Sequence, residues 1–196
     1  MNYYSLFVKK TLRYLLKPLS FLPALFMMYI IINFSSQTGG ESASLSYRVS
    51  KIIVLAYNKI LNKGYSNEIL NELIFLIHPF VRKTAHFTEY FVLALTVTVP
   101  LYVYRIRGIF LFFTGGIFCI LFAFLDEYVQ SFVLGRSSSL KDVGIDSSGA
   151  LSGILIAWLL CHIGRKTVFR GLSLEEYRKR KKAYENRLSQ EEKPFV

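Results

Sequence analysis

Four stretches of this chain are nearly uncharged and long enough to cross a lipid bilayer, and they limit its fold more than any other feature. A membrane-spanning helix needs about 20 mostly apolar residues, or a few fewer when its flanks are interfacial. No charged residue occurs between Lys17 and Glu41, and Pro23 in that run is tolerable if neighbouring helices satisfy the freed carbonyl. The predicted spans are residues 18–34, 84–104, 108–125 and 147–164.

The fold class that follows is all-α: a polytopic membrane helical bundle of four transmembrane helices with additional interfacial helices. The composition agrees, because 53% of the residues are hydrophobic and the mean hydropathy is +0.36, while the formal net charge is +11. That pairing is unusual for a water-soluble domain of 196 residues and suits an anionic bilayer. No small-residue cleavage site follows the first span, so we expect a retained anchor rather than a signal peptide.

The distribution of lysine and arginine predicts the orientation in the membrane. The N-terminal flank, the link between the second and third spans, and the C-terminal tail carry 16 of these residues, and the other two loops carry eight. Since the excess faces the cytoplasm, both termini are predicted to be cytoplasmic. We expect a basic flank at 1–17, a membrane domain at 18–164 and a basic cytoplasmic tail at 165–196. In the tail, Ser173 and Glu176 have the spacing of a capping box.

Residues 45–80, between the first two spans, are expected to lie at the outer membrane surface. Between Tyr47 and Leu61, apolar residues recur at helical spacing with polar residues on the opposite side, which is typical of an interfacial helix. Gly64 ends this segment. A second apolar stretch, 67–79, leads back to the membrane, and the sequence does not determine its depth.

Polar residues gather at the predicted outer ends of all four spans. Ionisable residues at this depth are costly and usually face a bundle interior or a watery cavity, so we expect the groups to meet. The steps of four and three residues place Arg82, His86 and Glu89 on one helical face, and Asp142 and Asp146 likewise lie one turn apart. The residues are Ser35, Ser36 and Gln37; Arg82, Lys83, His86 and Glu89; Asp126, Glu127 and Gln130; Arg136 and Ser137–Ser139; and Asp142 and Asp146.

Several chemistries suit this set, and the sequence leaves them open. A mutually neutralising network is the structural alternative, and a serine nucleophile and a divalent ion held by carboxylates are weaker ones. We expect no metal, since His86 is the only imidazole available and several cations lie nearby. No cofactor motif is present. The candidate catalytic residues for acid–base chemistry are His86, Glu89, Asp126 and Glu127. The candidate substrate-binding residues, which include arginines suited to anions, are Ser36, Gln37, Arg82, Lys83, Gln130, Arg136, Asp142 and Asp146.

The fourth span opens with Gly149 and Gly153, spaced as in the GxxxG pattern that lets membrane helices approach closely. The pattern indicates packing rather than catalysis. We assign the two glycines to a helix seam within the bundle, with a homodimer face as the alternative.

Taken in chain order, these positions resemble the VanZ-like family over about residues 28–164. The family is known for a member linked to teicoplanin resistance in Gram-positive bacteria. Two positions depart from its pattern, because Leu134 stands where proline is frequent and Asp146 where asparagine is frequent. The motifs that carry the resemblance are Phe34-Ser-Ser-Gln37, Arg82-Lys-x-x-His86-Phe-x-Glu89-Tyr90, Asp126-Glu-x-x-Gln130, Gly135-Arg136, Asp142, Asp146, Gly149 and Gly153.

The resemblance implies a bacterial plasma-membrane protein that acts at the cell envelope, with the matched polar residues as its site. In one hypothesis, an outer polar cavity engages an anionic lipid or lipid-linked wall precursor and reduces susceptibility to glycopeptide and lipoglycopeptide antibiotics such as teicoplanin. In the other, the protein is a membrane-embedded enzyme that modifies a lipid or wall-precursor head group by acid–base catalysis. The expected partners are membrane lipids and that precursor; no nucleic acid is expected, and a homodimer is left open.

Overall fold

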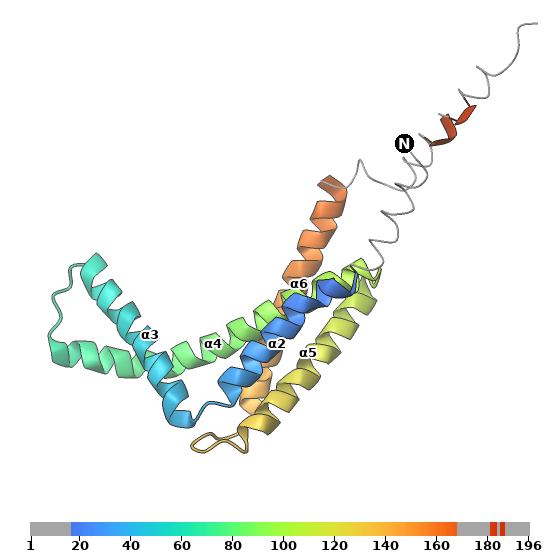
Figure 1. Cartoon of the computed structure of the whole chain (residues 1–196). Helices are drawn as coiled ribbons and strands as arrows, with labels where there is room; N and C mark the ends of the chain where they lie inside the picture. The colour runs from blue at the N-terminus through green and yellow to red at the C-terminus, as the bar shows by residue number, and fades with distance from the viewer. Residues whose placement is uncertain (1–16, 168–180, 184, 187–196) are drawn as a thin grey trace, which may run out of the picture. The chain divides into compact units, whose positions relative to one another are not determined.

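The computed structural model describes residues 17–167, 181–183 and 185–186. These residues form helices without strands (Figure 1), which confirms the predicted all-α class. Most of the N-terminal flank and of the tail, including the Ser173–Glu176 capping box, lies outside the described residues. The elements are η1 (Pro18–Phe21), α2 (Leu22–Ser35), α3 (Gly39–Ile60), α4 (Asn67–Val103), α5 (Ile109–Gln130) and α6 (Leu140–Thr167).

Four helical stretches are long and apolar enough to cross a membrane, as the uncharged runs predict: Pro18–Ser35, Asn67–Val103, Ile109–Gln130 and Leu140–Ile163. The protein is therefore a polytopic membrane protein. Three of its helices extend beyond the predicted spans, because charged residues interrupt an apolar run without interrupting a helix. α4 begins at Asn67 instead of Thr84, α5 continues to Gln130 instead of Leu125, and α6 begins at Leu140 instead of Ser147.

The apolar stretch 67–79 is the first third of α4 rather than a separate segment. The helix continues through Pro79, although proline removes a backbone hydrogen bond from a helix interior. Packing offsets that loss: α3 crosses this part of α4 (Figure 1), and Val54 of α3 is buried with Leu70 and Ile74. The predicted interfacial helix is thus part of the longer α3, and its apolar side is partly covered by α4.

Side-chain caps determine where α3 and α4 begin. Thr38 and Glu41 form a capping box, in which the Thr38 amide donates to Glu41 Oε2 at 2.9 Å and the Glu41 amide donates to Thr38 Oγ1 at 3.3 Å. The bond from the Thr38 amide lowers the pKa of the exposed Glu41 carboxyl from its usual value. Ser66 caps α4, because its Oγ accepts from the amide of Ile69 at 3.5 Å.

The second half of α4 packs with α2, α5 and α6 around one apolar core. Ile31 of α2, Tyr90 and Leu93 of α4, Cys119 of α5 and Ile154 of α6 belong to a single buried cluster, and none is more than 1% exposed. All four helices contribute to this buried cluster. The polar residues that lie next to it on each helix are therefore brought close together.

α6 approaches α4 at backbone distance. A Cβ atom added at Gly149 would meet the carbonyl oxygen of Phe87, and one added at Gly153 would meet that of Phe91. Glycine is the residue that allows such contact between membrane helices. The close approach places the N-terminal half of α6 directly against the face of α4 that carries His86.

The chain divides into two structural units, residues 1–157 and residues 158–196. The two cores described above belong to the first unit, as do α2 to α5 and the part of α6 up to Ala157. In the second, the rings of Trp158 and His162 stack with centroids 5.6 Å apart, and Lys181 Nζ lies 3.5 Å from Glu185 Oε1 in the described part of the tail.

Candidate functional site

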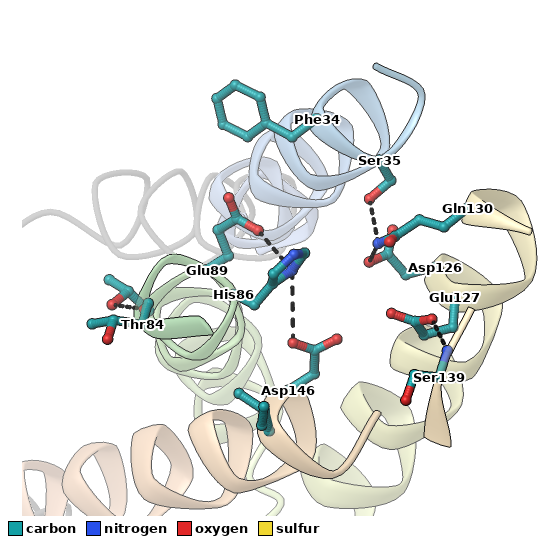
Figure 2. A network of polar contacts seen from close by, with 12 residues as sticks. Phe34, Ser35, Thr84, His86, Glu89, Asp126, Glu127, Gln130, Ser139 and Asp146 are labelled. Atoms are coloured by element: carbon teal, nitrogen blue, oxygen red, sulfur yellow. Dashed lines mark hydrogen bonds and ion pairs between the residues drawn. The ribbon is translucent and has the colours of Figure 1, made fainter. Parts of the chain in front are cut away.

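Polar side chains from four helices meet inside the bundle (Figure 2). Most of them are more deeply buried than polar groups usually are: Ser35, Asp126, Gln130 and Asp146 are at most 3% exposed. His86 and Glu89 lie beside them, with 16% and 20% of their side chains exposed. We call this set the polar cluster; its members are Ser35, His86, Glu89, Asp126, Gln130 and Asp146.

His86 of α4 occupies the centre of the polar cluster (Figure 2). Its Nδ1 atom lies 3.8 Å from Glu89 Oε2 and 3.9 Å from Asp146 Oδ1. The first contact follows from the spacing of three residues along α4, whereas the second joins α4 to α6. Both distances exceed the roughly 3.2 Å limit of a good hydrogen bond, so the imidazole is near both carboxylates without being hydrogen-bonded to either.

Asp126 is held from one side by residues of α5 and α2. Gln130, one helical turn further along α5, donates from Nε2 to Asp126 Oδ2 at 3.1 Å and to Ser35 Oγ at 3.3 Å. These bonds hold one carboxylate oxygen and leave the other, Oδ1, without a hydrogen-bond partner in the described residues. The amide of Gln130 therefore orients the Asp126 carboxylate.

Glu127 has a different environment from its neighbour Asp126. Its Oε2 accepts a hydrogen bond from the backbone amide of Ser139 at 2.8 Å (Figure 2). Adjacent helical positions point about 100° apart, so Glu127 faces the loop that connects α5 and α6. This contact anchors the loop, and the side chain lies outside the polar cluster.

Arg136 ties the same loop to α2. Its Nη2 donates to the carbonyl oxygen of Phe34 at 2.7 Å, which satisfies one of the free carbonyls at the C-terminal end of α2. Partial burial lowers the pKa of the Arg136 guanidinium from its usual value, mainly through loss of solvation. The other guanidinium nitrogens, Nε and Nη1, have no hydrogen-bond partner in the described residues.

The remaining predicted binding residues lie at the edge of this region or outside it. Lys83 and Ser36 are exposed, and Ser36 Oγ donates back to the carbonyl oxygen of Ile32 at 2.7 Å. Gln37, Arg82 and Asp142 are half-buried.

Tyr90 is a residue that the sequence reasoning did not assign to the site. Its side chain is fully buried, and its hydroxyl lies next to the Asp126 carboxylate without a hydrogen bond of good geometry in the described part of the chain. A buried tyrosine hydroxyl usually finds one. The available signals were its place at the end of the Arg82–Tyr90 motif and its position one helical turn after His86, but an aromatic residue in an apolar helix is more simply interpreted as core packing.

The polar cluster contains more acceptors than the described residues can satisfy. Both carboxylate oxygens of Asp146, Oδ1 of Asp126 and Nδ1 of His86 have no hydrogen-bond partner there. No ion pair among the described residues joins an arginine or lysine to a carboxylate of the polar cluster. Direct contacts therefore do not form the neutralising network that the sequence left open. Buried polar atoms are nearly always paired, so these exceptions require an explanation.

Comparison with known proteins links the region to one family. The family model described as VanZ/LLP1 matches residues 20–161, a range that includes every member of the polar cluster. No curated protein and no solved structure matches the chain.

Proposed function

This chain belongs to the VanZ/LLP1 family, and we propose that it acts at the outer face of a bacterial plasma membrane. In this proposal the cations beside the polar cluster, Arg82, Lys83 and Arg136, engage an anionic lipid or a lipid-linked wall precursor, and the protein thereby reduces susceptibility to teicoplanin. The observation that carries it is that Arg136 keeps two buried guanidinium nitrogens, Nε and Nη1, without a hydrogen-bond partner in the described residues, next to a bundle interior that holds further unpaired polar atoms. Such groups are costly in a membrane and are generally retained for function.

A groove between α3 and α4 supports the choice of an anionic partner. It has a volume of about 540 Å³, and its lining includes Arg48, Lys51 and His78. The imidazole of His78 is fixed by the hydroxyl of Ser46, 2.8 Å from its Nε2. Arginine and lysine side chains beside a membrane helix attract the phosphates of lipid head groups. We propose that the phosphates of a lipid-linked precursor lie along this groove.

The proposal requires the α5–α6 loop to face the outside of the cell and both termini to face the cytoplasm. A cysteine placed at the exposed Ser138 is expected to react with a membrane-impermeant thiol reagent on intact protoplasts. A cysteine placed at Ser189, in the tail, is expected to react only after lysis. The wild type, with its two native cysteines, provides the background. The opposite labelling pattern would reverse the assigned orientation.

Teicoplanin susceptibility tests the proposed function directly. The wild type, Glu89→Gln and Asp126→Asn are expressed at matched membrane levels in a sensitive Gram-positive host. We expect the wild type to raise the minimal inhibitory concentration and both variants to lose most of that protection, because each removes one carboxylate while retaining side-chain size.

Glu72→Gln is the matched control for this experiment. It removes one acidic charge from an exposed position of α4, outside the polar cluster, and should protect as well as the wild type. Absence of protection by the wild type would refute the resistance proposal. Full protection by both cluster variants would show that the carboxylates of Glu89 and Asp126 are not needed for it.

A further inference from the structure

Three potential metal ligands in the polar cluster lie close together although they come from three different helices. One ring nitrogen of His86, one carboxylate oxygen of Asp126 and one of Asp146 are all within 4.8 Å of one another. They belong to α4, α5 and α6, so it is the packing of the bundle, rather than a local sequence motif, that assembles them (Figure 2).

The ligand atoms are available for coordination. Asp126 and Asp146 are both 0% exposed. Oδ1 of Asp126, both carboxylate oxygens of Asp146 and Nδ1 of His86 lack hydrogen-bond partners in the described residues. Two carboxylates buried this close repel each other unless protons or a cation neutralise them. The guanidinium of Arg136 donates to the Phe34 carbonyl instead of to a carboxylate.

The surroundings of these atoms resemble those of a prepared metal site. Residues that hold a ligating carboxylate by hydrogen bonding its second oxygen typically tune metal binding, and Gln130 does so for Asp126 at 3.1 Å. Glu89 lies beside the same imidazole, with its Oε2 3.8 Å from His86 Nδ1. Ser35 supports Gln130 in turn, at 3.3 Å.

We propose that His86, Asp126 and Asp146 form a binding site for one divalent cation of the Mn²⁺ or Zn²⁺ class. Mixed imidazole and carboxylate ligands suit these ions, whereas Ca²⁺ takes six to eight oxygen ligands. A +2 ion balances the two buried carboxylates. The ligands of one tetrahedral ion lie about 3.5 Å from one another, so binding draws the three side chains together by up to about 1 Å.

This inference goes beyond the proposed function and departs from the sequence-based expectation of no metal. That expectation treated the neighbouring arginines and lysines as counter-ions because of their number. In the structure, no ion pair of the described residues connects them to Asp126 or Asp146. Neither buried carboxylate therefore has a direct cationic partner among the described residues, and Arg136 acts on Asp126 only as a nearby charge.

Metal binding can be measured on the purified full-length protein in detergent, after removal of any affinity tag. Titration with Mn²⁺, followed by loss of the paramagnetic resonance signal of the free ion, is expected to show one site per chain. Zn²⁺ should displace the Mn²⁺, because it binds nitrogen-containing sites more tightly. An excess of Ca²⁺ should not. This readout involves no antibiotic, so its failure is distinguishable from failure of the resistance proposal.

Substitutions then locate the site. Asp126→Asn and Asp146→Asn are expected to weaken Mn²⁺ binding by more than about 100-fold, and Gln130→Ala, a positioning residue, by about 10–100-fold. Glu72→Gln on α4 serves as the charge-matched control and should bind like the wild type. Because an aspartate variant can misfold, Gln130→Ala provides an independent arm that leaves all three ligands in place.

Two outcomes would overturn the inference. One is a wild type that binds neither Mn²⁺ nor Zn²⁺ at millimolar concentration, which would indicate that protons neutralise the carboxylates. The other is binding that is unchanged in the folded aspartate variants and in Gln130→Ala, which would place the ion elsewhere on the chain.

Discussion

Replacing Gly149 with alanine is expected to disrupt the packing of α6 on α4 and to deplete the folded protein from the membrane. The new Cβ would meet the backbone carbonyl of Phe87, which cannot rotate away as a side chain could. Overpacking of this kind costs about 1–3 kcal/mol and more when backbone must move. The effect should be largest here because the same helices also touch at Gly153, where a Cβ would lie 3.0 Å from the Cβ of Ala94.

Gly144→Ala provides the matched control on the same helix. No atom lies within 4 Å of a Cβ at Gly144, and alanine favours a helix over glycine by about 1 kcal/mol. Membrane levels and thermal unfolding of the detergent-purified protein are the measurements. Equal stability of Gly149→Ala and Gly144→Ala would mean that α6 does not approach α4 as closely as the structure indicates.

Gly39→Ala is expected to separate the start of α3 from the α5–α6 loop. A Cβ at Gly39 would collide with the backbone carbonyl of Gly135, and the Gly39 amide donates to the carbonyl oxygen of Leu134 at 3.0 Å. Gly135 has a φ of +74°, a conformation that favours glycine and limits how the loop can adjust. The displaced loop carries Arg136, so its bond to the Phe34 carbonyl should be lost as well.

Gly40→Ala, at the neighbouring residue, is the control for this prediction. A Cβ added at Gly40 would meet no atom within 4 Å, so Gly40→Ala should unfold at the same temperature as the wild type or slightly higher. Gly39→Ala should unfold at a lower temperature and expose the loop. The rate at which a cysteine at Ser138 reacts in each background measures that exposure. Identical rates in the two variants would contradict the prediction.

The α5–α6 loop has a structural role that follows from these contacts. Glu127 binds the Ser139 amide at 2.8 Å, and Arg136 binds the end of α2 at 2.7 Å. The loop therefore connects α2, α3 and α5 at the end of the bundle where the polar cluster lies. Changes in the loop are expected to alter access to that cluster without removing any of its members.

Much of the fold could be predicted from the sequence because hydropathy is a local property. A helix in a bilayer satisfies its own backbone, so an uncharged run of sufficient length indicates a span without knowledge of its neighbours. The boundaries were less predictable. Lys141 and Asp142 shift the apparent start of α6 to Ser147, although charged residues in the first turn are compatible with a helix. Arg82 and Lys83 similarly shift the apparent start of the second span to Thr84, whereas α4 begins at Asn67 and packs there against α3.

The candidate site could be predicted only in part. Spacing places His86 with Glu89 and Asp126 with Gln130, since each pair lies about one turn apart on one helix. It does not reveal the partners across helices, such as Asp146 for His86 or Ser35 for Gln130. Nor does it separate Asp126, which faces the cluster, from Glu127, which faces the loop. Tyr90 was missed because its burial next to the Asp126 carboxylate is a tertiary property.

By itself, therefore, the sequence determined that the chain is an all-α membrane protein with four apolar spans and, through its motifs, that it belongs to the VanZ/LLP1 family. These properties follow from composition and spacing along the chain. Only the tertiary structure decided that His86, Asp126 and Asp146 bring their ligand atoms within 4.8 Å of one another while Arg136 bonds elsewhere. The physical reason is that charge balance in a bundle depends on distances between helices, and those are set by side-chain packing and by the glycines that allow α6 to touch α4.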